Sequence, residues 1–418
     1  MTPARPVALF ALAALLSWSG CKRPDASDDG TVRFLAGPDV GGFAKEIIRE
    51  FSQANPDVTI EMVEGPAATN TREDMYATSL MAHEDTYDIV FMDVVWMPKF
   101  AAQGWLRPLD DLFTPELQAD FLPGDLEGSR YKGKTYRVPV QADGGMLYYR
   151  KDLLAAKGIR PPETFAELLA AAKKLQDPPK LWGFVFQGMQ YEGLVCDFLE
   201  LLWGNGGELI DAAGQVRVDG PEAVEALTWL VDAVHAHKIA PPGVLTYAEE
   251  ESRHMFQEGK AVFMRNWPYV WNLVQEDKSP IRGKVGIIPM VHAPGKRGAA
   301  TLGGWGYGIS AFTKKPEKAW KFVQWATSAR SQKLAYLKGG IIPTRQALFS
   351  DPDVIRTSPH YKDLYEVLKH ARPRPVHPAW ARISDALQVN LSSALSGQAK
   401  PEAALKAAAQ QIRTVVQP

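Results

Sequence analysis

The residues with the clearest capacity for chemistry are two aspartates, Asp93 and Asp143. Asp93 lies near the end of the mostly apolar run 88–94, and Asp143 lies just before the glycine pair Gly144-Gly145. An ionised carboxylate accepts several hydrogen bonds from a polar ligand, and a pair of carboxylates can also act as acid and base in hydrolysis. Each aspartate also admits a structural interpretation, because Asp93 could cap the next helix and Asp143 could serve a turn.

Motifs for other chemistries are missing from the sequence. It contains no G-x-S-x-G, H-E-x-x-H, P-loop or C-x-x-C pattern, and His235 and His237 are too close in sequence to share a helix face. We therefore expect no metal ion and no cofactor. The 47 basic and 48 acidic residues nearly balance, so the overall charge gives no support for nucleic-acid binding. Cys196 lies in an apolar stretch and is expected to be a buried, inert thiol.

The first 30 residues are expected to serve export rather than the fold. An apolar run, 7–16, follows Arg5 and leads through small residues to Cys21. The run is shorter than the roughly 20 residues that a membrane span needs. Ser19-Gly20-Cys21 resembles a bacterial lipobox, with Trp18 where leucine is usual; the alternative is an ordinary secretory signal. We expect a signal peptide over 1–20, a lipid on Cys21, and a polar tether over 21–30.

Alternating strands and helices must position the two aspartates. Thr31–Ala36 and the segments 58–62 and 88–94 have strand patterns, and helical patterns with apolar residues on one face separate them, with the second helix over 72–82. This order predicts a parallel sheet flanked by helices, in which ligands bind beyond the carboxyl ends of the strands.

A second α/β unit is expected after Gly144-Gly145. The predicted strands are 146–150, 260–265 and 284–288, and the predicted helices are 164–175, 222–238, 316–337 and two in 379–416 separated near Gly397. The glycine-rich block 303–310 forms another crossing between the units. Two α/β lobes joined by more than one glycine-containing crossing predict a hinge and a cleft.

Several segments together resemble the extracellular solute-binding proteins of carbohydrate ABC importers, especially the trehalose- and maltose-binding branch. These segments are 88–96, 104–109, 138–150, 265–269, 303–310 and 342–345. The resemblance implies a two-lobed, type II periplasmic-binding-protein fold without catalysis. The lobes would comprise 31–142 with 306–350, and 143–305 with 351–418.

The resemblance also implies a set of ligand-binding residues. Their positions in this chain are Thr69, Asp93, Asp143, Trp267, Gly304 and Trp305, with a late arginine at either Arg372 or Arg374, of which Arg374 is favoured. Two positions depart from the family pattern. Val40 stands where the first loop usually carries a glutamate, with Asp39 beside it, and Gln141 replaces a frequent aromatic. Asp39 and Gln141 are therefore included among the candidates. Helix capping by Thr69, core packing of either tryptophan and a surface role for either arginine are the structural alternatives.

This residue set suits a sugar. Carboxylates and arginine bind hydroxyl groups, and a flat indole covers the weakly apolar C–H face of a pyranose. We therefore expect an exported, lipid-anchored, monomeric receptor that delivers a disaccharide to an ABC permease and its ATPase. The alternatives are a receptor for a longer oligosaccharide, a polyol or a glycerol phosphate, a sugar-sensing lipoprotein outside transport, or a glycoside hydrolase that uses Asp93 and Asp143.

Overall fold

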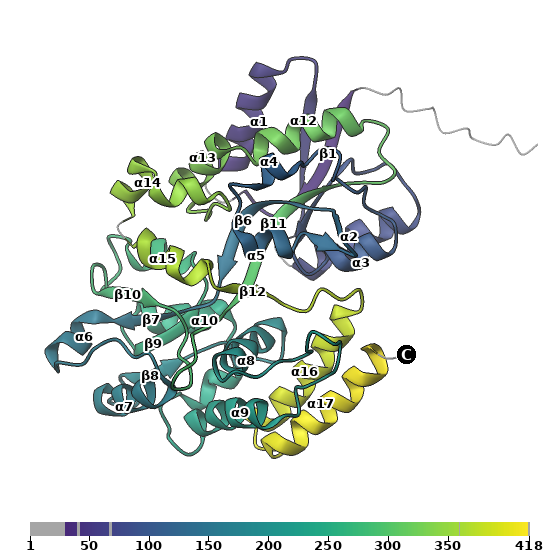
Figure 1. Cartoon of the computed structure of the whole chain (residues 1–418). Coiled ribbons are helices and arrows are strands. Elements are labelled where there is room, and N and C mark those ends of the chain that lie inside the picture. The colour runs from purple at the N-terminus through teal and green to yellow at the C-terminus, as the bar shows by residue number, and fades with distance from the viewer. Residues whose placement is uncertain (1–29, 40–41, 67–68, 359, 417–418) are drawn as a thin grey trace, which may run out of the picture.

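The computed structural model describes residues 30–39, 42–66, 69–358 and 360–416. The predicted signal peptide, Cys21 and nearly all of the tether lie outside these residues. The described chain forms two lobes, drawn one above the other in Figure 1. Among its helices, none combines the length and the apolar character that crossing a membrane requires.

The first lobe begins with the predicted alternation of strands and helices. The elements are β1 (Thr31–Ala36), α1 (Phe43–Ala54), β2 (Thr59–Glu64), α2 (Thr69–Met81), β3 (Ile89–Asp93) and α3 (Met97–Ala102). β1 pairs in parallel with β2, as expected. Ile47 and Phe51 are buried on one face of α1, where the apolar spacing placed them. The pattern of strands and helices therefore fixes the edge of the sheet at which Asp93 ends β3.

Short elements then lead to the strand that leaves the first lobe. They are α4 (Pro115–Gln118), α5 (Pro123–Glu127), the hairpin of β4 (Arg130–Tyr131) and β5 (Lys134–Thr135), and finally β6 (Val138–Gly144). β6 pairs antiparallel with β11 (Ala300–Ile309), which also pairs with β3 and, in parallel, with β12 (Ala371–Pro373). Asp93 and Asp143 therefore lie on strands that flank the same central strand.

The second lobe is built on a mixed sheet. Its strands are β7 (Met146–Arg150), β8 (Trp182–Val185), β9 (Ala261–Asn266) and β10 (Val285–Ile288), in the order β10-β7-β9-β8. Its helices are α6 (Lys151–Ala156), α7 (Phe165–Leu175), α8 (Glu192–Gly204), α9 (Pro221–Val234), α10 (Glu249–Gln257) and α11 (Val270–Val274), with the 3-10 helix η1 (Pro242–Thr246). α8 is buried from Gly193 to Gly204, so it forms the centre of this lobe. Cys196 is among its buried residues, as predicted, and burial raises the pKa of its thiol.

Within the described residues, three segments cross between the lobes: the Gly144-Gly145 junction between β6 and β7, the strand β11, and the segment that contains β12. Figure 1 shows these segments passing side by side through the middle of the molecule. At Gly145 a Cβ atom would lie 1.8 Å from Glu200 Oε1, so a side chain cannot fit there without displacing Glu200. The glycine at this junction is thus required by close packing.

The predicted helix 316–337 is wrong in one respect, because the structure divides it into α12 (Pro316–Ala326) and α13 (Ala329–Gly339). Ser328 has extended backbone angles, and its hydroxyl accepts a hydrogen bond from the Ser331 N–H, so it ends one helix and caps the next. The 3-10 helix η2 (Gln346–Ser350), α14 (Pro352–Thr357) and α15 (Tyr361–Leu368) follow.

Two long helices complete the chain. α16 (Trp380–Leu395) and α17 (Pro401–Val416) are separated where Gly397 predicted a break. They pack against α8 and α9 and contribute buried residues such as Leu391, Leu405 and Ile412 to the second-lobe core. The predicted lobe boundaries themselves stay a prediction. Lys333 of α13 pairs with Asp353, so α14 lies against an element assigned to the first lobe.

Candidate ligand-binding site

A cavity of about 1020 Å³ lies between the lobes and receives side chains from both of them. Seven of the predicted binding residues line it: Thr69, Asp93, Asp143, Trp267, Gly304, Trp305 and Arg374. Asp39, Gln141 and Arg372 are not among its described lining residues. The structure therefore gathers residues that are up to 305 positions apart along the chain into one cavity.

Asp93 makes local contacts and also lines the cavity. Its Oδ1 accepts a hydrogen bond from the Val95 N–H at 3.1 Å and lies 3.7 Å from Arg374 Nη2. In the sheet Asp93 pairs with Trp305 of β11. The capping and ligand-binding interpretations of Asp93 are thus compatible, because one oxygen makes these contacts and the other is left for a ligand.

Trp305 is fixed by aromatic neighbours in the first lobe. Its ring stacks on Phe91 at a centroid distance of 5.0 Å and meets Trp96 edge-on at 5.3 Å. The guanidinium of Arg72 lies 5.0 Å from the ring centroid. These contacts hold the indole against the cavity wall in a fixed orientation.

Gly304 explains how β11 passes so close to β6. Its φ angle is +110°, and a Cβ atom there would lie 2.3 Å from the carbonyl oxygen of Gln141. The pairing register with β6 shifts directly afterwards, between Trp305 and Gly306. Only glycine suits both the backbone angle and the space, and the irregular strand places Trp305 beside the cavity.

Asp143 is half-buried at the crossing and carries a perturbed carboxyl group. Its burial raises the pKa to about 7, and the charge of Asp93 acts in the same direction. Gln141 opposes the shift by donating from Nε2 to Asp143 Oδ2 at 3.2 Å, and the charge of Arg265 opposes it as well. The structure thus places Gln141 behind Asp143, where it orients the carboxyl group.

The structure separates the two late arginines. Arg372 is exposed; it bonds Glu208 at 2.8 Å and stacks on Trp203 away from the cavity. Arg374 is buried and donates from Nη1 to Glu192 Oε1 at 2.7 Å. Its Nε has no hydrogen-bond partner among the described residues. Arg374, which the sequence favoured, is therefore the arginine positioned at the cavity.

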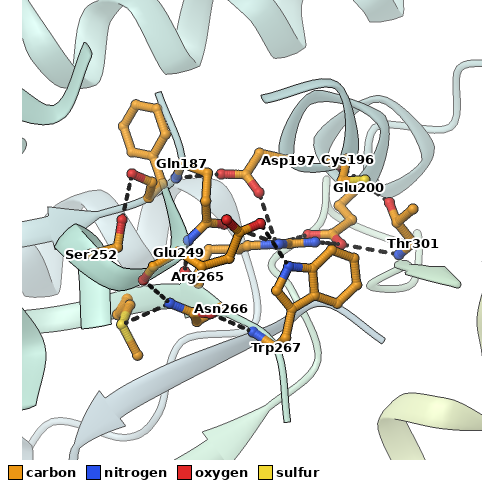
Figure 2. Close-up of polar contacts among 12 residues, drawn as sticks. Gln187, Cys196, Asp197, Glu200, Glu249, Ser252, Arg265, Asn266, Trp267 and Thr301 are labelled. Atoms are coloured by element: carbon orange, nitrogen blue, oxygen red, sulfur yellow. Dashed lines mark hydrogen bonds and ion pairs between the residues drawn. The ribbon is translucent and has the colours of Figure 1, made fainter. Parts of the chain in front are cut away.

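Trp267 is held by contacts with second-lobe residues, as Figure 2 shows. Its backbone N–H donates to Asn266 Oδ1 at 2.8 Å, and its indole Nε1 donates to Glu249 Oε1 at 3.4 Å. The guanidinium of Arg265 lies 4.1 Å from the ring centroid. Trp267 and Trp305 thus present aromatic surface from the second lobe and from β11, respectively.

Asp39 and Thr69 both lie near helix starts, but only Thr69 lines the cavity. The Asp39 carboxylate accepts hydrogen bonds from the backbone N–H groups of Ala44 and Lys45 at 3.0 Å, so it serves the first turn of α1. Thr69 begins α2, is exposed and lines the cavity. A ligand contact by Asp39 stays a prediction that the cavity does not support, since both carboxylate oxygens are engaged elsewhere.

Glu192 lines the cavity and accepts several side-chain hydrogen bonds, but sequence reasoning missed it. It accepts hydrogen bonds from Arg374, from Trp380 Nε1 at 3.0 Å and from the Ser384 hydroxyl. Other lining residues absent from the prediction include Glu73, Asp74, Trp96, Lys99, Tyr191, Glu249, Tyr269, Trp380, Asp385 and Gln388. Nothing in the local sequence marks Glu192, but Tyr269 lies in the 265–269 segment and could have been included.

A two-lobed molecule with a polar and aromatic cavity between its lobes is the arrangement expected of a receptor for a small solute. The chain belongs to the bacterial extracellular solute-binding proteins, whose family model matches residues 37–333. This match confirms the resemblance that the sequence motifs indicated, and the solved two-lobed structures described next confirm the fold class.

Individual relatives support the same assignment. A Deinococcus radiodurans protein named "Probable ABC transporter-binding protein" is 36% identical and aligns over 83% of this chain and 84% of its own. The maltose-bound MalE3 structure of T. maritima is 40% identical, with a TM-score of 0.83 and coverage of 92% and 99% of the two chains. A solute-binding protein of Agrobacterium radiobacter K84 in complex with ribitol is 28% identical, with a TM-score of 0.80 and coverage of 93% and 99%.

Proposed function

We propose that this chain is the substrate-binding receptor of an ABC importer, and that it captures a disaccharide-type carbohydrate such as maltose, trehalose or sucrose. The observation that carries the proposal is the composition of the cavity. Asp93, Asp143 and Arg374 offer charged hydrogen-bonding groups, while Trp267 and Trp305 offer flat apolar surface. Adjacent hydroxyls need the former, and the C–H faces of pyranose rings need the latter.

The size and charge of the cavity support a neutral saccharide. Its volume of about 1020 Å³ is at the upper end of the roughly 300–1,000 Å³ range of small-molecule sites, so rings rather than a short polyol would fill it. Seven of the described lining residues are acidic and two are basic: Glu73, Asp74, Asp93, Asp143, Glu192, Glu249 and Asp385 against Lys99 and Arg374. This charge balance disfavours a glycerol phosphate.

Polyols are the alternative that a specific finding favours. A Pseudomonas aeruginosa relative named as a mannitol-binding protein is 25% identical and aligns over 88% of each chain, and the ribitol complex is similar in fold. The maltose-bound relative is more similar in sequence, at 40% identity. We therefore place a disaccharide first and a polyol second.

Calorimetric titration with maltose, trehalose, sucrose, maltotriose, mannitol, ribitol and glycerol 3-phosphate tests the ligand class. We expect saturable binding of at least one disaccharide and none of glycerol 3-phosphate. Binding of mannitol or ribitol without any disaccharide would replace the proposal by the polyol receptor.

The same samples test for catalysis. A receptor releases its sugar unchanged, so prolonged incubation with maltose, trehalose or sucrose should yield no free glucose. Steady glucose release that Asp143→Asn abolishes would instead support the glycoside hydrolase.

Delivery to a permease, a monomeric state and a lipid on Cys21 are further parts of the proposal. They are supported by the family and by the N-terminal sequence. Mass spectrometry of the mature protein checks the lipid.

A further inference from the structure

A fully buried arginine lies directly beneath Trp267, one of the tryptophans that line the cavity. Arg265 is 0% exposed, and its guanidinium carbon lies 4.1 Å from the centroid of the Trp267 ring. Arg265 belongs to β9, and Trp267 follows its last residue, so side chains two positions apart point to the same side. The guanidinium covers one face of the indole, which leaves the other face for a ligand in the cavity.

Side chains from two other segments fix the guanidinium in this position. Arg265 Nε lies 2.8 Å from Glu200 Oε2 and 2.9 Å from Asp197 Oδ1, and Nη1 donates to Gln187 Oε1 at 3.0 Å. Asp197 and Glu200 are three positions apart on α8, which places both carboxylates on one side of that helix. Figure 2 shows the guanidinium extended between these groups and Trp267.

The same network contacts two of the crossings between the lobes. Glu200 Oε1 accepts a hydrogen bond from the backbone N–H of Thr301 in β11 at 3.0 Å. It also occupies the space beside Gly145, where a Cβ atom would lie 1.8 Å from Glu200 Oε1 and 2.2 Å from Arg265 Nη2. The orientation of the tryptophan and the packing of the crossings therefore depend on the same two side chains.

Stability alone does not account for this arrangement. A buried ion pair contributes little net stability compared with apolar side chains of similar volume, because desolvation offsets the attraction. Its distinctive property is geometry: the planar guanidinium stacks on an indole and bonds carboxylates in its own plane, which a lysine cannot do.

We propose that Arg265 is a positioning residue for Trp267, and that Glu200 links the position of this ring to the crossings. The part of the proposal that concerns binding rests on the proposed sugar-receptor function. The ring then has a fixed orientation before the sugar arrives, and sugar binding at Trp267 biases the crossings toward the closed arrangement of the lobes.

A double-mutant cycle tests the proposal with the disaccharide that the titrations identify. The variants are Arg265→Lys, Trp267→Leu and the double variant. Arg265→Lys should raise the Kd about tenfold in the otherwise unchanged protein, as expected for loss of a well-packed stacking cation. In the Trp267→Leu background the same change should alter the Kd less than about twofold, because the two residues act through one contact. Equal effects in both backgrounds would overturn the proposal.

A ligand-free measurement keeps the proposal separate from the proposed function. The difference in fluorescence between the wild-type protein and Trp267→Phe isolates the emission of this tryptophan. The same difference, taken between Arg265→Lys and the Arg265→Lys/Trp267→Phe double variant, should differ from the wild-type difference spectrum. Arg150→Lys is the matched control, because Arg150 is also buried and paired with an aspartate, and it is not among the described residues lining the cavity. The Arg150→Lys variant should keep the wild-type difference spectrum and the wild-type Kd.

The outcomes of the two measurements are distinguishable. A wild-type protein that binds no sugar would refute the proposed function, and the fluorescence comparison would still decide whether Arg265 positions the ring. An unchanged difference spectrum in a folded Arg265→Lys protein would overturn the positioning role even if sugar binds.

Discussion

Two arginines that are nearly adjacent in sequence have opposite surroundings, and this contrast gives the sharpest test of a single residue. Arg374 is buried at the cavity between Asp93 and Glu192, whereas Arg372 is exposed and paired with Glu208. Arg374→Lys should weaken sugar binding about tenfold or more, because lysine cannot reproduce the planar set of donors. Arg372→Lys should leave the Kd unchanged. Calorimetry on both variants decides, and equal effects would contradict the assignment.

The carboxyl group of Asp143 predicts pH-dependent binding. Its pKa of about 7 means that this carboxyl group is only partly ionised near neutral pH before a ligand binds. Because sugar hydroxyls donate more strongly to a carboxylate than to a carboxylic acid, affinity should rise as the pH increases from 6 to 8. Titrations across this range measure the slope, and Asp143→Asn should remove it. A slope that persists in this variant would assign the dependence to another group.

The same pKa predicts the direction of a stability change. The unfolded chain releases the Asp143 proton near pH 3.9, whereas the folded protein holds it to about pH 7. Binding of this proton therefore contributes fully to the free energy of unfolding below about pH 4, and this contribution is lost as the pH rises through 7. Asp143→Asn should flatten this part of the dependence of unfolding free energy on pH, measured by urea denaturation. An unchanged profile would mean that Asp143 ionises normally.

How far the site could be predicted depends on where the partners of each residue lie. Asp93, Trp267 and Trp305 carry local signals, namely a strand end, a motif and flanking glycines, and the structure places them at the cavity. Glu192 carries no such signal, because its bonding partners Arg374, Trp380 and Ser384 are 182 to 192 positions away. The actual ligand contacts of all these residues stay predictions.

At the scale of elements, periodicity identified the strands β1, β2, β3, β7, β9 and β10 and the longer one-sided helices, such as α1, α7, α9, α16 and α17. It did not identify α8, which is buried all round, or shorter helices such as α10 and α15. Capping decided the division of the helix predicted over 316–337. The predicted helix ran through residues 327–333, where Ala329 is the only apolar residue, so the apolar spacing did not support its continuation. Thr327 and Ser328 were the available signal: Ser328 caps α13, and the Thr327 hydroxyl donates to the Val323 carbonyl at 2.7 Å. Serine and threonine also occur inside helices, so these two residue types alone do not distinguish a cap from a helical position.

The Gly145 junction gives a prediction at this scale. Gly145→Ala should displace Glu200 and so weaken sugar binding severalfold, although Gly145 is not among the described residues that line the cavity. Gly243→Ala is the matched control, because Gly243 is exposed in η1 and a Cβ atom there has its nearest neighbour at 3.5 Å. Calorimetry and thermal unfolding should show a loss only for Gly145→Ala. Equal behaviour of both variants would argue against close packing at the crossing.

At the scale of the whole molecule, the position of the cavity between the lobes predicts closure on binding. Contacts available only when both lobes touch the ligand shift the population toward a closed form. Small-angle X-ray scattering should therefore show a smaller radius of gyration with saturating sugar, and not with a non-binding member of the panel. Mass action should also raise the melting temperature, since ligand at 100 times the Kd adds about 2.7 kcal/mol of stability. An unchanged radius with a raised melting temperature would indicate binding without closure.

The packing of α16 and α17 against α8 and α9 has a consequence for biogenesis. The core of the second lobe contains Leu147 near its beginning and Ile412 near the end of the chain. The first lobe likewise combines Val32 with Ala335. Neither core can be completed while the distal part of the chain is still being synthesised, and such long-range contacts slow folding. A newly made chain should therefore remain unfolded for longer, which favours threading through a translocation channel.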